Sequence, residues 1–127
     1  MKEKRMKGII DEYIKAYNKF DLEGMMKNLS IDIVFKNITN GEITLELNGK
    51  YAFKSQVEQA FNLFKKRKMK IIDQKFGDDT VENTVDFKGV LDLDIPDGPK
   101  KYELIKLQSK SIFQFKDGKI ILIEDIT

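Results

Sequence analysis

Residues 109–127 read SKSIFQFKDGKIILIEDIT, and the organisation of the whole chain can be worked out from them. Two runs rich in β-branched and aromatic residues flank Asp117-Gly118, a dipeptide that accepts the positive φ angles of a type I′ turn. The sequence therefore predicts a β-hairpin at the end of the chain. If the turn has two residues and the register is regular, Ser111 lies opposite Glu124 on one face of this hairpin.

Both faces of the hairpin are expected to be covered. Residues 120–123 are apolar four times in succession, whereas a sheet with one face in water alternates apolar and polar residues. We expect the protein's own helices to cover one face and a second copy of the chain to cover the other. The predicted homodimer forms through outer isoleucines, namely Ile112, Ile121 and Ile123.

Composition narrows the classes of function. A chain of 127 residues with 41% hydrophobic residues is expected to form one domain over residues 1–127. With 23 basic and 21 acidic residues, the net charge of +2 gives no reason to expect nucleic acid or membrane as a partner. The sequence has no Cys and no His, which excludes thiolate and imidazole metal sites and Ser-His-Asp triads. No cofactor and no metal site are expected.

The sequence also bears on location. The first residues are charged, and neither a signal-peptide run nor an apolar stretch of membrane-spanning length follows them. We therefore expect a cytoplasmic protein.

Two helices and a hairpin are predicted in the first half of the chain. Apolar residues at steps of three and four predict an amphipathic helix that ends near Lys19. Asp21 can cap a second helix over residues 22–29. A hairpin follows, because β-rich runs at residues 31–38 and 43–47 flank the turn dipeptide Asn40-Gly41.

A third helix and three long strands are predicted next. Ser55-Gln56-Val57-Glu58 has the form of a capping box, and the helix is expected to end in the basic residues 65–68. Strands are predicted over residues 69–76, 80–93 and 101–115, between clusters of turn residues. Three N-terminal helices on one face of a strongly curved, cone-shaped antiparallel sheet give an α+β domain with a cavity between the layers.

This order of elements resembles the nuclear transport factor 2-like superfamily, which has a cystatin-like fold and includes ketosteroid isomerases and SnoaL-type polyketide cyclases. The residues that carry the resemblance are Tyr13, Asn18, Asp21-Leu22-Glu23-Gly24, Asp32 and Val34. The resemblance implies a conical cavity between helices and sheet. It implies no single activity, because one scaffold hosts unrelated functions.

The ketosteroid isomerases offer the sharpest comparison. They keep a Tyr on the first helix, a carboxylate base after the second helix and a protonated Asp late in the sheet. Here Tyr13 matches the Tyr, Asn37 falls at the position of the base, and Ser111 falls at the position of the late Asp. Since an amide cannot abstract a proton, the resemblance implies a shared pocket without that isomerase activity.

Glu124 and Tyr13 are the predicted acid–base pair. Glu124 is expected to point into the cavity, where apolar surroundings raise the pKa of a carboxyl group towards neutrality. The remaining ligand-binding candidates combine neutral hydrogen-bonding groups with aromatic rings, the usual lining of a small-molecule site. They are Tyr17, Asn37, Phe53, Phe61, Phe87, Ser109, Ser111 and Phe113.

Three classes of function stay open at this point. The first, which we favour, is a domain that binds a small apolar or amphipathic ligand in the conical cavity. The second is an isomerase, cyclase or dehydratase that uses Glu124 and Tyr13. The third is a protein-interaction module that uses the outer face of the sheet.

Overall fold

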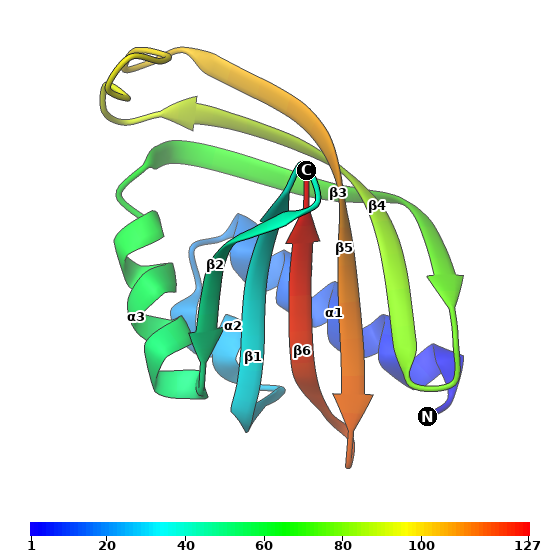
Figure 1. Cartoon of the computed structure of the whole chain (residues 1–127). Coiled ribbons are helices and arrows are strands. Elements are labelled where there is room, and N and C mark those ends of the chain that lie inside the picture. Colours follow the sequence, from blue (N-terminus) through cyan, green and yellow to red (C-terminus); the bar gives the residue numbers. More distant parts are fainter.

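The computed structural model describes residues 1–127, which form three helices and six strands (Figure 1). The helices are α1 (Glu3–Asn18), α2 (Leu22–Met26) and α3 (Lys50–Ala60). The strands are β1 (Leu29–Thr39), β2 (Glu42–Asn48), β3 (Phe64–Phe76), β4 (Thr80–Leu91), β5 (Leu104–Lys116) and β6 (Lys119–Ile126). None of the helices is long and apolar enough to cross a membrane.

The six strands form one sheet in the order β2-β1-β6-β5-β4-β3. Neighbouring strands of the sheet pair antiparallel except β1 and β6, which pair parallel, so the sheet is mixed rather than wholly antiparallel as predicted. The parallel pair joins the first strand to the last. It brings residues from the two ends of the sheet-forming sequence side by side.

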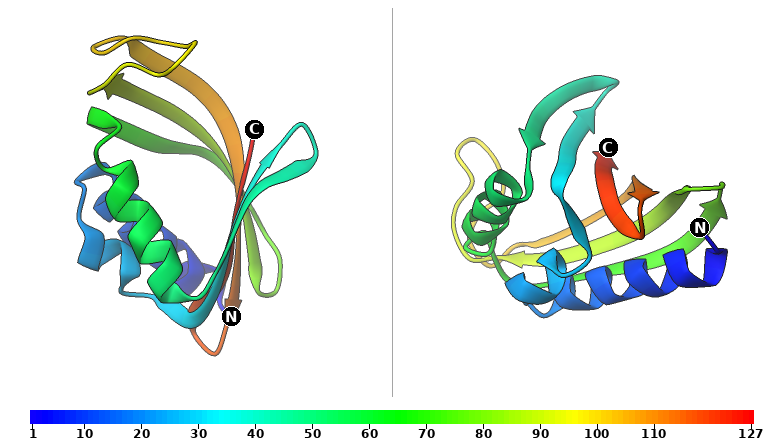
Figure 2. Two further views of the ribbon diagram at one scale, coloured as in Figure 1. Left: turned by 60° about the vertical axis from the view of Figure 1, so that its left-hand side comes forward. Right: turned by 90° about the horizontal axis from the view of Figure 1, so that it is seen from below.

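The helices gather on one side of the sheet, as predicted, and the long strands bend over them. In Figure 2 the upper parts of β3, β4 and β5 lean towards the side on which α1, α2 and α3 lie. A core of buried apolar residues fills the space between the layers. Its largest fully buried side chains include Met6 and Ile10 of α1, Ile33 of β1 and Phe113 of β5.

The end of α1 is attached to the edge of the sheet by one side chain. The side-chain amide of Asn18 donates to the carbonyl oxygen of Met69 at 3.0 Å, and its oxygen accepts from the Met69 backbone N–H at 2.7 Å. The Asn18 side chain thus makes the same pair of hydrogen bonds to β3 that the backbone of a neighbouring strand would make. This attachment fixes the face of α1 that looks towards the sheet.

The two predicted hairpin turns and the predicted cap at Asp21 are confirmed. Asn40 and Gly41 have φ angles of 53° and 78°, and Asp117 and Gly118 have φ angles of 52° and 78°. Positive φ at both central residues is the property of a type I′ turn. At the start of α2, a side-chain oxygen of Asp21 accepts a hydrogen bond from the Gly24 N–H at 3.1 Å, as a capping residue should.

The predicted bounds of the third helix were wrong. Helix α3 begins at Lys50, directly after Gly49, whose φ of 94° suits a glycine, and it ends at Ala60. Ser55 therefore lies inside the helix rather than at its start. The basic residues 65–68 belong to β3 and not to a helix end. This difference changes the position of Arg67, which lies on a strand.

The predicted register of the last hairpin was wrong beyond the first pairs. Phe115 pairs with Ile120, as predicted, but Gln114 pairs with Leu122, and the residue between, Ile121, has no partner on β5. Such a β-bulge reverses the face to which every later residue points. Ser111 therefore lies opposite Asp125 and not opposite Glu124.

Candidate functional site

A cavity of about 260 Å³ lies between the helices and the inner face of the sheet. Fourteen residues from all three helices and from β1, β2, β3 and β6 line it, and ten of them are hydrophobic when Tyr13 and Tyr17 are included. The polar side chains among them therefore sit in mostly apolar surroundings. These polar groups are Tyr13, Tyr17, Asn37, Gln56, Arg67 and Asp125.

Asp125 is the carboxylate of this cavity. The bulge at Ile121 turns Ile123 and Asp125 to the inner face, on the side of Phe113 and Ser111. Across the parallel pair, Asp125 is in register with Asn37 of β1. Adjacent strands lie about 4.8 Å apart, so the carboxylate and the amide are neighbours in the cavity wall.

The surroundings of Asp125 favour its neutral form. Burial raises the pKa of the Asp125 carboxyl group from 3.8 to about 7. An apolar wall cannot hydrate a negative charge, so the proton is held more tightly than in water. A carboxyl group with such a pKa gains and loses a proton near neutral pH, which is the property that a general acid or base needs.

Two tyrosines of α1 face the same cavity, one helical turn apart. The ring of Tyr13 packs edge-on against Phe113, with 5.5 Å between the ring centroids. Burial raises the pKa of the Tyr13 hydroxyl well above 10, and the charge of Asp125 raises it further. Burial also raises the pKa of Tyr17. Both hydroxyls therefore stay protonated at neutral pH and can donate hydrogen bonds.

Arg67 reaches the cavity from β3. Its guanidinium carbon lies 3.6 Å from the ring centroid of Tyr17 and 4.5 Å from that of Phe20. Its Nε donates to the carbonyl oxygen of Tyr17 at 3.0 Å, whereas its Nη2 is buried and has no hydrogen-bond partner. Burial lowers the pKa of Arg67, although a guanidinium remains protonated at neutral pH. The site thus contains a stacked cation with an unused donor.

A second bulge turns Arg67 inward. Phe64 pairs with Leu91 and Lys66 pairs with Val90, so Lys65 has no partner on β4. Phe64 and Arg67, three residues apart, consequently point to the same face. Gly89, opposite Arg67 on β4, leaves room for the ring of Phe64, since a Cβ atom at Gly89 would lie 2.6 Å from that ring.

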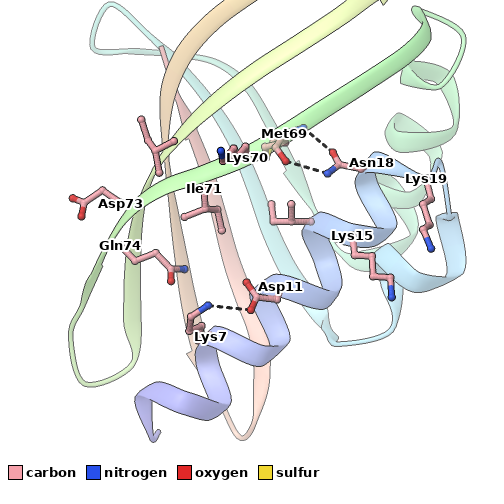
Figure 3. A pocket seen from close by; sticks show the side chains of 12 residues that line it. Lys7, Asp11, Lys15, Asn18, Lys19, Met69, Lys70, Ile71, Asp73 and Gln74 are labelled. Carbon is pink, nitrogen blue, oxygen red and sulfur yellow. Dashed lines mark hydrogen bonds and ion pairs between the residues drawn. The ribbon is translucent and has the colours of Figure 1, made fainter.

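A larger pocket of about 640 Å³ lies outside, between α1 and β3 (Figure 3). Its polar residues include the exposed pair Lys7 and Asp11, whose side chains form an ion pair at 3.2 Å. The Asn18–Met69 hydrogen bonds close one part of it (Figure 3). We do not place the functional site here, because the charged side chains that line this pocket are all exposed to solvent.

Four of the predicted site residues line the inner cavity: Tyr13, Tyr17, Asn37 and Phe53. The others belong to the surrounding core or sheet. Phe113 packs behind Tyr13, Phe61 packs against Phe20, and Phe87 packs against Phe64. Ser109 lies farther along β5, in register with Val85.

Ser111 is not a cavity residue either. It is buried, and its hydroxyl oxygen accepts a hydrogen bond from the Asn83 side chain at 3.2 Å. The oxygen of Asn83 in turn accepts from Gln74 at 2.8 Å. These three side chains thus form a chain of hydrogen bonds with one another. Ser111 therefore has a structural partner and is not free to orient a ligand.

Glu124 points away from the cavity. It lies on the outer face, between Ile112 of β5 and Lys36 of β1. The predicted pairing of Glu124 with Tyr13 in one site is therefore wrong. The same bulge takes Ile123 out of the predicted dimer face, because its side chain is only 1% exposed and belongs to the core.

Sequence reasoning missed two charged residues of the site. Asp125 follows Glu124 directly, and only the unpartnered Ile121 decides which of the two faces inward. Arg67 was placed in a solvated helix end. One signal was present: Gly89, in a strand that otherwise alternates apolar and polar residues, indicates a place where another side chain approaches closely.

Comparison with known proteins identifies the fold. Residues 10–123 match the family described as the SnoaL-like domain. No curated protein matches the sequence. Many solved structures are similar to this chain.

Three of these structures illustrate the range of proteins that share this fold. A candidate polyketide cyclase from Xanthomonas campestris pv. campestris is 20% identical, with a TM-score of 0.82 over 98% of this chain and 90% of that one. An LEH-like epoxide hydrolase from M. tuberculosis is 15% identical, with a TM-score of 0.76 over 97% and 82%. A protein of ketosteroid isomerase-like fold from Catenulispora acidiphila, solved with trimethylamine, is 9% identical, with a TM-score of 0.73 over 92% and 82%. At these identities the likeness shows the fold alone.

Proposed function

Because the chain belongs to the SnoaL-like domain family, we propose that its inner cavity binds a small, largely apolar carbonyl compound and that Asp125 transfers a proton to or from it. The observation that carries this proposal is a carboxyl group with a pKa of about 7 in a cavity lined mainly by hydrophobic residues. The proposal keeps the expected pocket and its use of Tyr13. It replaces Glu124 with Asp125.

The roles follow from the chemistry of each group. The Asp125 carboxylate accepts a proton from the carbon next to the carbonyl group, and the electrons of that C–H bond form an enolate. The Tyr13 hydroxyl and the Asn37 amide, both in the cavity wall, donate hydrogen bonds to the enolate oxygen. Return of the proton from Asp125 to another carbon of a conjugated enolate completes an isomerisation. In an aldol-type ring closure the enolate carbon instead attacks a second carbonyl group of the ligand, and Asp125 gives its proton to the alkoxide oxygen that forms.

Alpha-proton exchange tests this proposal without knowledge of the natural substrate. The probes are three neutral cyclic ketones, cyclohexanone, 1-tetralone and 2-tetralone, in D₂O at neutral pD. NMR follows the loss of the α-proton signals. We expect the wild-type chain to accelerate exchange of at least one ketone and Asp125→Asn to return it to the uncatalysed rate, since an amide is not a base.

Two further variants sharpen the test. Glu124→Gln, one residue away on the outer face, should exchange like the wild type. Tyr13→Phe should slow the exchange about 10²–10³-fold, as loss of one oxyanion donor does elsewhere. Equal exchange by wild type and Asp125→Asn would show that the cavity at most binds ligands and would refute the proton-transfer role.

A further inference from the structure

Arg67 is a buried positive charge without an anionic partner in the chain. The residue is 7% exposed, and its Nη2 is the one buried side-chain nitrogen or oxygen of the molecule that lacks a hydrogen-bond partner. None of the five ion pairs of the chain includes it. An unpaired buried charge is costly, so its presence in a cavity wall points to a partner that comes from outside.

The nearest candidate within the cavity does not serve as that partner. Asp125 makes no ion pair with Arg67, and its pKa is raised by burial rather than lowered by a neighbouring cation. In the sheet, β6 and β3 are separated by β5 and β4. Arg67 and Asp125 thus approach the cavity from separate strands, and each keeps its own function.

The guanidinium group is held in one orientation. The ring of Tyr17 stacks on it at 3.6 Å, Phe61 approaches it at 5.2 Å, and the bond from Nε to the Tyr17 carbonyl oxygen fixes its plane. A planar fork held in this way is suited to a planar anion such as a carboxylate, which accepts two parallel hydrogen bonds. A flexible lysine would not offer this geometry.

We propose that Arg67 binds a carboxylate group of the ligand, so that the compound taken up by the cavity is a small carboxylic acid with a largely apolar or aromatic body. The cavity of about 260 Å³ limits the size of that body. The carboxylate lies at β3, and the remainder of the molecule extends over the hydrophobic lining towards Asp125. This inference rests on the proposed function, since it uses the same cavity.

Calorimetry with matched pairs of acids and amides tests the inference. The probes are benzoate, cinnamate and 2-naphthoate, each compared with its primary amide, which has nearly the same shape and no charge. We expect the wild-type chain to bind at least one acid about tenfold or more tightly than its amide, because hydrogen bonds between charged groups are the stronger ones. Equal affinity within every pair, or binding of none of the acids, would overturn the inference.

Two variants test whether Arg67 is the residue that causes the preference for the acid over its amide. Arg67→Met should abolish the preference for the acid, so that the acid and its amide bind with similar affinity. Lys68→Met removes the same charge from the adjacent, exposed position of β3 and should keep the preference. An Arg67→Met variant that still prefers the acid would contradict the assignment.

A measurement on the wild-type chain keeps the test valid if Arg67→Met does not fold. The ¹⁵N signals of the Arg67 guanidinium should shift on addition of the bound acid and not on addition of its amide. Unchanged signals in the presence of a bound acid would overturn the inference.

The two proposals fail separately. Ketone exchange uses neutral probes and depends on Asp125, whereas the acid–amide preference depends on Arg67. Loss of the preference with exchange intact refutes only the carboxylate site. Absence of Asp125-dependent exchange with the preference intact refutes only the proton-transfer role.

Discussion

The raised pKa of Asp125 is caused by its apolar surroundings and not by a charged partner. Burial is the cause that raises its pKa to about 7. The neighbouring Asn37, in register across the parallel strands, is neutral and adds no second charge. A carboxylate at residue 37 would repel the charge of Asp125. The amide at that position is therefore consistent with one proton-transferring group in this cavity.

The raised pKa makes the stability of the chain depend on pH. The folded chain binds more protons than the unfolded chain between the unfolded value of 3.8 and the folded value of about 7, so the contribution of Asp125 to stability falls as the pH rises through this window. The fall amounts to at most about 4 kcal/mol, at 1.36 kcal/mol for each pH unit between these two pKa values.

Asp125→Asn should therefore be more stable than the wild type at pH 8, and this advantage should shrink towards pH 4. Urea unfolding at a series of pH values measures the difference. Glu124→Gln, on the outer face, is the control and should follow the wild-type curve. Parallel curves for wild type and Asp125→Asn would show that the pKa of Asp125 is not raised in the folded chain.

At the scale of elements, short-range sequence signals predicted most helices and turns correctly, whereas the register of the last hairpin was not predicted correctly. Helical periodicity, the Asp21 cap and the two type I′ turns depend on residues close together in the sequence, and all of them were confirmed. The faces of β3 and β6 depend on unpartnered residues, Lys65 and Ile121, and neither carries a distinctive signal. Each bulge turns one charged residue into the cavity, Arg67 in β3 and Asp125 in β6.

Engineered disulfides test the register of the last hairpin. The chain has no cysteine, so an introduced pair has no competitor. Ile112→Cys with Glu124→Cys should oxidise readily, since directly opposite residues of antiparallel strands have Cα atoms within the range that a disulfide spans. Ser111→Cys with Glu124→Cys should not, because the two side chains point to opposite faces. Non-reducing mass spectrometry distinguishes the pairs, and the reverse result would restore the regular register.

At the scale of the whole molecule, the outer face of the sheet is the surface that the chain leaves open. Ile112 and Ile121 remain partly exposed there, while Ile123 is buried in the core. Leu122 and Ile126, also partly exposed, join them through the shifted register. The homodimer therefore stays a prediction, with Ile123 removed from its interface and Leu122 and Ile126 added.

Light scattering at micromolar concentration tests the dimer. We expect twice the chain mass of 14.8 kDa for the wild type. Ile112→Lys should give a monomer, because it places a charge in the apolar contact. Tyr51→Lys, which changes an 88% exposed residue of α3, should leave the dimer intact. A monomeric wild type would contradict the prediction and leave the outer face free for a different protein.

The most direct test of the account is the titration of Asp125 itself. Carbon-13 NMR of the aspartate carboxyl groups, with Asp125→Asn to assign the signal, follows the protonation of this one side chain in the folded protein. We predict a midpoint near pH 7, from burial in the apolar cavity. A midpoint near the ordinary aspartate value of about 3.9 would place Asp125 in water and contradict the site described for this chain.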